Sequence, residues 1–170
     1  MNYVPKIALT YGNLRLVMRA MKMIRITLFA AALSLAVSTA LAANVHLGTW
    51  KLNESKSKLA AGTPHNTMVT YRTGDNGTIK LTCDGIDKDG KATRWTWQGK
   101  FDGKQYKVKG AGPSDSMAYT IQDSHTNMLQ GVRHGKVVLS GAIQVAPDGK
   151  SRKVTTTIDG KTTVSYYDKL

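Results

Sequence analysis

Three aromatic residues in the middle of the chain have a spacing that would let them bind an apolar ligand. Trp95 and Trp97 are two residues apart, so in a β-strand both side chains point to one face, and Phe101 has the same phase. Tyr71 and Tyr119 could add hydroxyl groups to the same cavity. A barrel core also needs large side chains, and a register slip of one residue would invert the face. The sequence therefore does not decide whether these residues line a ligand cavity or fill the core of the barrel.

Motifs that mark common enzymes do not occur in the sequence. It contains no nucleophile elbow, phosphate-binding loop, dinucleotide fingerprint or zinc-protease motif. Glu54 is the only glutamate, so a paired-carboxylate mechanism would have to use aspartates. We therefore predict that the protein is not an enzyme and carries no cofactor, and we keep catalysis on the same scaffold as a third hypothesis.

The histidines and aspartates do not form a metal-binding pattern. The four histidines are His46, His65, His125 and His134, and their separations match no zinc motif. Asp84, Asp87 and Asp89 lack both the spacing and the distal glutamate of a calcium loop. Asp87 and Asp89 are better explained by a hairpin turn. We predict no metal site, although residues distant in sequence could still meet in space.

Short strands separated by tight turns fill residues 43–170. The turn pairs are Asn76-Gly77, Asp84-Gly85, Asp89-Gly90, Asp102-Gly103, His134-Gly135, Asp148-Gly149 and Asp159-Gly160. Such pairs supply the positive φ angles that hairpin turns need. Between them, segments rich in Val, Ile, Thr, Tyr and Trp alternate apolar and polar residues, which is typical of half-buried strands.

About ten strands are predicted from this pattern. They are His46–Leu52, Thr67–Thr73, Thr78–Cys83, Ala92–Lys100, Gln105–Lys109, Met117–Gln122, Met128–Arg133, Lys136–Val145, Lys153–Ile158 and Thr162–Asp168. The best candidate for a helix is Ser55–Ala61, which Gly62 and Pro64 would end. A meander of so many strands must close or fold over to hide its edges. The expected fold is therefore all-β: an antiparallel up-and-down β-barrel of about 8–10 strands.

An ordered set of motifs carries a resemblance to a known family. Residues 48–53 read Gly-Thr-Trp-Lys-Leu-Asn, and Lys-Ser follows at 56–57. Residues 84–91 read Asp-Gly-Ile-Asp-Lys-Asp-Gly-Lys. Asp-Gly-Lys stands at 148–150, before a Thr-rich strand and a terminal tyrosine strand. The first motif resembles the lipocalin and fatty-acid-binding (calycin) superfamily, and the whole set is similar to small lipocalin-like proteins exported by environmental bacteria.

The resemblance implies a structural role for Gly48, Trp50 and a basic residue late in the chain. The indole of Trp50 would pack across the closed end of the barrel, against Arg152 or Arg133, by stacking and cation–π contact. Two features depart from the family. The link between the first two strands is too short for the paired helices of fatty-acid-binding proteins, and the chain ends in a strand rather than a helix.

Residues 21–42 have the order of a secretory signal peptide. Lys22 and Arg25 precede an apolar run, and the small-x-small sequence Ala-Leu-Ala ends at Ala42. The alternative is a membrane anchor, since the run is near the minimum length for spanning a bilayer. We expect three parts: an upstream extension at 1–20, disordered or not translated; a signal peptide helix at 21–42; and a barrel domain at 43–170. The protein would then be periplasmic or secreted, with no stable membrane anchor after cleavage.

The chain is strongly basic, with 24 Lys and Arg, 11 Asp and Glu and a net charge of +13. Because the basic residues are spread singly, nucleic acid is not an expected partner. Cys83 is the only cysteine, and we expect a buried thiol rather than an intermolecular bridge. The leading hypothesis is an exported, non-enzymatic binding protein that holds a small, largely apolar ligand. The alternative is an interaction protein of the cell envelope with a filled barrel and a cationic outer surface. The oligomeric state stays open.

Overall fold

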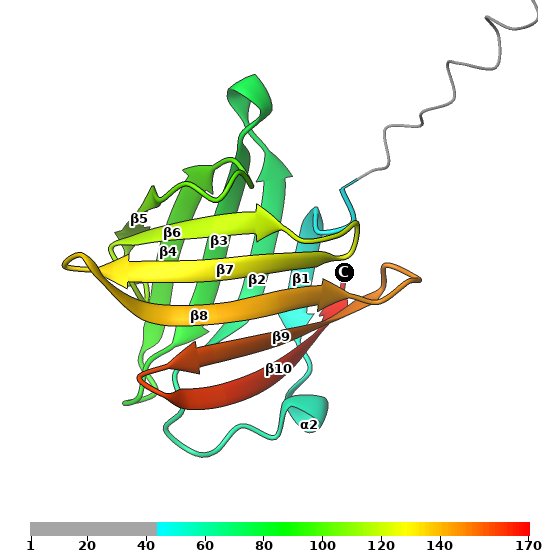
Figure 1. Cartoon of the computed structure of the whole chain (residues 1–170). Helices are drawn as coiled ribbons and strands as arrows, with labels where there is room; N and C mark the ends of the chain where they lie inside the picture. The colour runs from blue at the N-terminus through cyan, green and yellow to red at the C-terminus, as the bar shows by residue number, and fades with distance from the viewer. Residues whose placement is uncertain (1–43) are drawn as a thin grey trace, which may run out of the picture. The chain divides into compact units, whose positions relative to one another are not determined.

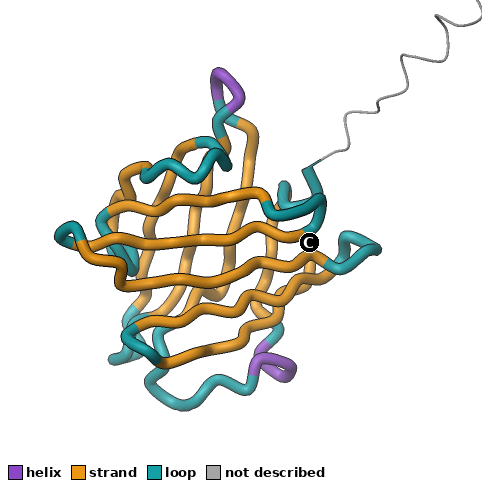
Figure 2. Tube along the Cα trace, in the orientation of Figure 1, coloured by secondary structure: helices purple, strands orange, loops and turns teal. Residues whose placement is uncertain are grey.

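The computed structural model describes residues 44–170, which form ten antiparallel β-strands (Figures 1 and 2). The strands are β1 (Gly48–Leu52), β2 (His65–Thr73), β3 (Ile79–Ile86), β4 (Ala92–Gly99), β5 (Tyr106–Gly110), β6 (Ser116–Ile121), β7 (Thr126–Arg133), β8 (Lys136–Val145), β9 (Ser151–Ile158) and β10 (Lys161–Lys169). The predicted signal peptide and the extension before it lie outside the described residues.

The strands close into a barrel in which every strand pairs with its neighbours along the chain. The first strand completes the ring, because β1 pairs with both β2 and β10. Trp50 stands opposite Val69 on one side and Lys169 on the other. This arrangement confirms the predicted antiparallel up-and-down barrel. Its ten strands match the ten segments expected from the alternation of apolar and polar residues.

The two ends of the barrel carry different connections. One end, called here the linker end, holds the β1–β2 linker and the turns that follow β3, β5, β7 and β9. The other end, called here the terminus end, holds the first described residues, the chain's C-terminus and the turns that follow β2, β4, β6 and β8 (Figure 1).

Two short helical turns interrupt the strands: α2 (Glu54–Ser57) and the 3₁₀ turn η1 (Asp75–Gly77). The helix predicted over Ser55–Ala61 was wrong in its extent. Asn53 caps α2 by accepting a hydrogen bond from the Lys56 backbone amide. Lys58 then adopts a left-handed conformation with φ of 45°, which ends the helix well before Gly62. Within residues 44–170, no helix has the length and apolar character needed to cross a membrane.

Alternation along each strand separates the interior from the surface. In β3, Ile79, Leu81 and Cys83 are buried, and the residues between them are more exposed. Cys83 is 1% exposed, which confirms the expected buried thiol, and burial raises its pKa. A thiol in this position is neutral and inert.

The terminus end is packed around the indole of Trp50, which is fully buried. Its Nε1 donates a hydrogen bond to the His46 carbonyl oxygen over 2.9 Å. The Arg152 guanidinium carbon lies 4.7 Å from the centre of the indole. Gly48 enters the strand with φ of 117°, a conformation that residues other than glycine rarely adopt. The residues of the Gly-x-Trp motif thus have local structural reasons for their identities.

Replacing Trp50 should show how much this packing contributes to stability. Trp50→Ala should lower the free energy of unfolding by about 3–5 kcal/mol, because it removes a fully buried aromatic ring. Trp50→Phe keeps a ring beneath Arg152 but loses the hydrogen bond, so its loss should be smaller. Urea denaturation of the two variants measures both values, and an unchanged midpoint for Trp50→Ala would contradict this account of the terminus end.

Candidate ligand-binding site

The barrel interior is hollow toward the linker end. A cavity of about 700 Å³ extends inward from that end. Its walls come mainly from inward-facing residues of β4, β8, β9 and β10. They include Trp95, Leu139, Val154, Thr156, Thr163 and Ser165. This volume is in the range of pockets that take small molecules.

Loops at the linker end form the mouth of this cavity. The mouth is bounded by residues 61–64 of the β1–β2 linker and His65 at the start of β2. Ile86 and Asp87 at the β3–β4 turn and residues 111–113 after β5 also bound it. Asp159 and Lys161 of the β9–β10 turn complete it. The opening therefore depends on four connections, while the walls belong to the sheet.

Small inward side chains explain why this half of the barrel is not filled. Thr156 stands opposite Thr163 in the β9–β10 pairing, and it faces Gly141 in the β8–β9 pairing. A Cβ at Gly141 would collide with the backbone oxygen of Thr155, so this position cannot carry a side chain without moving the strand. With only two threonine side chains and a glycine at these positions, space remains between the strands.

A β-bulge in β2 adds an amide to the cavity wall. The pairing of β2 with β3 shifts between Asn66 and Met68, so that Asn66 lies opposite Gly85 and lines the cavity. Its Oδ1 accepts a hydrogen bond of 3.2 Å from Trp95 Nε1. Its backbone oxygen accepts one of 2.9 Å from the Tyr167 hydroxyl. Asn66 thus fixes both aromatic rings.

The aromatic residues predicted as site residues divide between two places. Trp95 lines the cavity. Trp97, Phe101 and Tyr119 pack together toward the terminus end, with ring centres 4.8 Å apart for Trp97 and Tyr119 and 5.3 Å for Phe101 and Tyr119. Tyr71 contacts the edge of Phe101. These four residues form a cluster that is separate from the cavity walls.

Several wall residues carry no mark in the sequence. Thr156, Thr163 and Ser165 belong to the Thr-rich final strands, where alternation indicates two faces but not which one is inside. Asn66 enters the wall only because of the bulge. The one available indication was the β-strand pattern itself, which places Thr156 and Ile158 on the same face.

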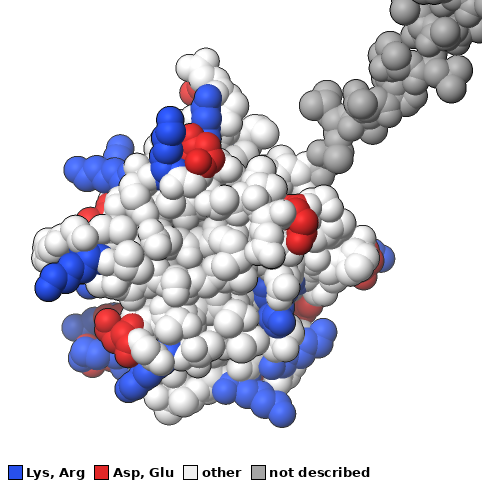
Figure 3. Space-filling view, viewed as in Figure 1, with Lys and Arg blue, Asp and Glu red and all other residues white. Residues whose placement is uncertain are grey.

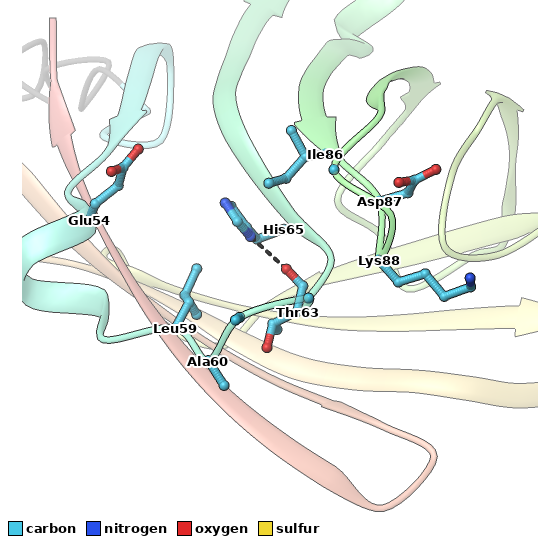
Figure 4. A pocket seen from close by; sticks show the side chains of 11 residues that line it. Glu54, Leu59, Ala60, Thr63, His65, Ile86, Asp87 and Lys88 are labelled. Atoms are coloured by element: carbon cyan, nitrogen blue, oxygen red, sulfur yellow. Dashed lines mark hydrogen bonds between the residues drawn. The ribbon is translucent and has the colours of Figure 1, made fainter.

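A smaller hollow of about 370 Å³ lies beside the linker (Figure 4). Glu54, Leu59 and Lys88 line it outside the barrel, and His65 Nδ1 lies 2.7 Å from the Thr63 carbonyl oxygen. It shares His65, Ile86 and the linker residues 61–63 with the mouth of the large cavity. We therefore treat it as part of the entrance and not as a separate site.

The charged groups do not form a second site on the viewed surface. Figure 3 shows lysines and arginines scattered mostly near the edge of one face, with a broad uncharged area over the strands in front. In the part of the chain that the structure describes, no group of three or more His, Cys, Asp or Glu side chains is close enough to hold a metal ion.

His46 is a buried titratable group at the terminus end, far from the mouth. It is 3% exposed, and neither ring nitrogen has a hydrogen-bond partner among residues 44–170. Burial lowers its pKa from 6.5 to about 4, and the positive charges of Arg152 and Lys169 act in the same direction. The imidazole is therefore neutral at physiological pH.

No protein-family model matches the chain, and no curated protein matches it. Several solved structures are similar in fold. A crystal structure of a mutant of the fluorescent protein UnaG is 15% identical with a TM-score of 0.47, and the match covers 73% of this chain and 95% of that one. A redesigned β-barrel, mFAP1, bound to DFHBI is 13% identical with a TM-score of 0.41, with 76% and 98% covered.

The buried imidazole should make stability depend on pH. Below pH 6.5 the unfolded chain binds a proton at His46 that the folded protein does not bind until about pH 4. The free energy of unfolding should therefore decrease as the pH is lowered from 6.5 to about 4. Above pH 6.5 it should not depend on His46. His46→Phe should remove this component, and comparing urea midpoints of the two proteins from pH 7.5 to 4 measures it. Equal slopes in both proteins would contradict the assignment.

Proposed function

We propose that the protein is a non-enzymatic binding protein that holds a small ligand in the cavity at the linker end of its barrel. The observation that carries this proposal is the cavity of about 700 Å³, which reaches the barrel interior from one end. It is concave, its walls are mixed apolar and polar, and the walls belong to paired strands. These are the properties of a preformed small-molecule pocket.

The two halves of the barrel favour this proposal over an interaction protein with a filled barrel. At the terminus end, the aromatic cluster and Trp50 leave little room. At the linker end, Gly and Thr stand where large apolar residues would have filled the core. Filling both halves would stabilise the fold, since buried apolar area contributes about 25 cal/mol per Å². An unfilled half is therefore better explained by a ligand than by stability.

A cavity-filling substitution tests the proposal directly. Thr156→Phe places a ring inside the cavity, whereas Thr155→Phe places the same ring on the outer face of the same strand, between Ala142 and Val164. Titration with prodan, a neutral dye whose emission shifts to the blue in apolar surroundings, should show saturable binding to the native protein. We expect binding at least about tenfold weaker in Thr156→Phe, a change of about 1.4 kcal/mol, and unchanged in Thr155→Phe.

Circular dichroism of both variants controls for folding. Absence of saturable prodan binding to the native protein would count against the proposed function. Equal weakening by the two substitutions would place the dye on the outside of the barrel.

We also propose that the protein acts after export, in the periplasm or outside the cell. The order of charged, apolar and small residues in 21–42 supports this. A cut after Ala42 would leave His46 and all later core residues in the mature protein.

Expression of the full chain in a Gram-negative host tests the export proposal. The intact mass of protein in the periplasmic fraction should correspond to a chain that begins at Ala43. Ala42→Arg should block cleavage and leave an uncut product in the membrane fraction. An uncut native chain held in the membrane would argue for an anchor instead.

A further inference from the structure

We propose that the ligand is an uncharged molecule that combines a flat ring with hydrogen-bonding groups such as hydroxyl or carbonyl. This inference rests on the proposed function, since it concerns the occupant of the same cavity. It follows from what the cavity walls offer on two opposite sides and from where the charged groups lie.

The inner walls of the cavity offer no charged partner, because the basic and acidic lining residues His65, Asp87, Asp159 and Lys161 all lie at the mouth. Asp159 and Lys161 line it only at the rim, where both are exposed. The Asp87 carboxylate accepts hydrogen bonds from two backbone amides of its own turn. The buried guanidinium of Arg152 lies 4.8 Å from the centre of the Tyr167 ring and does not line the cavity. A carboxylate or ammonium inside would lose its hydration without gaining an ion pair, which is costly.

One side of the cavity carries hydroxyl groups that are free to bind a ligand. Thr156 and Thr163 are direct partners across β9 and β10, so their side chains lie together on the inner face. No hydrogen bond joins either hydroxyl to another group in residues 44–170, although the outward pair Thr157 and Thr162 bond to each other over 2.9 Å. A purely apolar ligand would displace water from these hydroxyls without forming a hydrogen bond to them, which costs free energy.

The opposite side carries a flat aromatic surface. β4 and β9 are separated by four strands in either direction around the ring, so Trp95 faces the hydroxyl side across the barrel. The Trp95 indole is held by its bond to Asn66 and is therefore a fixed surface for ring contact. A ligand that spans the cavity thus meets a ring on one side and hydroxyl groups on the other.

Three compounds with one ring system separate the possible ligand classes. The compounds are 2-naphthol, 2-naphthoate and 2-methylnaphthalene, which differ only in carrying a neutral hydrogen-bonding group, a negative charge or a methyl group. Calorimetric titration of the native protein at pH 7 should give binding of 2-naphthol at least about tenfold tighter than that of either other compound.

Matched double variants assign the preference to the inner hydroxyls. Thr156→Val with Thr163→Val removes both hydroxyls and keeps the side-chain shape, so 2-naphthol and 2-methylnaphthalene should then bind about equally. Thr155→Val with Thr162→Val makes the same change on the outer faces of the same strands and should leave the preference intact. A preference that survives the inner double variant would overturn the role of these hydroxyls.

The outcomes distinguish this inference from the proposed function. Binding of 2-methylnaphthalene as tight as that of 2-naphthol overturns the need for hydrogen bonds, and tightest binding of 2-naphthoate overturns the neutral class; in both cases the binding function stands. Prodan is itself a neutral ring with a carbonyl group, so saturable prodan binding that Thr156→Val with Thr163→Val leaves unchanged overturns the inference alone. Failure of prodan and all three compounds to bind overturns the proposed function with it.

Discussion

The contact on which the rest of the barrel depends is the one that Arg152 makes where the first strand meets the last. Its guanidinium lies 4.7 Å from the centre of the Trp50 indole, 5.2 Å from that of Tyr71 and 4.8 Å from that of Tyr167. These residues come from β9, β1, β2 and β10, which are four consecutive strands around the ring. One buried cation thus joins both sides of the closure. Among the described residues it has no carboxylate partner, and its Nε and Nη1 have no hydrogen-bond partner, so the three aromatic faces are the favourable contacts that the structure gives it.

Packing at this end determines what the other end can do. Large rings crowd the terminus end and fix the register of strands far apart in sequence, because a slip in β1 or β10 would remove Trp50 or Tyr167 from Arg152. With register set there, the linker end does not need a dense core to specify the fold. It can carry glycine and threonine at inward positions and remain open. The stability of one half therefore permits the cavity of the other.

The sequence predicted the fold well because the fold depends on local patterns. Turn pairs such as Asp89-Gly90 and Asp159-Gly160 separate strands whose two-residue period is plain, and ten such strands have few ways to hide their edges. The boundaries differ by only a few residues at most strands. The helix was less predictable, because it ends at Lys58, whose left-handed conformation no residue preference indicates. The predicted signal peptide and the extension before it lie in residues 1–43, which the structure does not describe.

The candidate site was harder to predict because a period of two gives the face of a residue but not its depth along the barrel. Trp95 and Trp97 share a face, yet they lie about 7 Å apart along β4, and this step separates the cavity wall from the aromatic cluster. The inward threonines were also hard to predict. A polar residue such as Thr156 is usually expected on the solvent-facing side of a strand, yet it lies on the inner face. Pairing in the β8–β9 and β9–β10 hairpins places Thr156 on the same face as Gly141 and Thr163, and closure of the ring by β1 and β10 makes that face the inner one. The polar side of the cavity is thus a property of the closed ring, and it is the feature that distinguishes this interior from a purely apolar one.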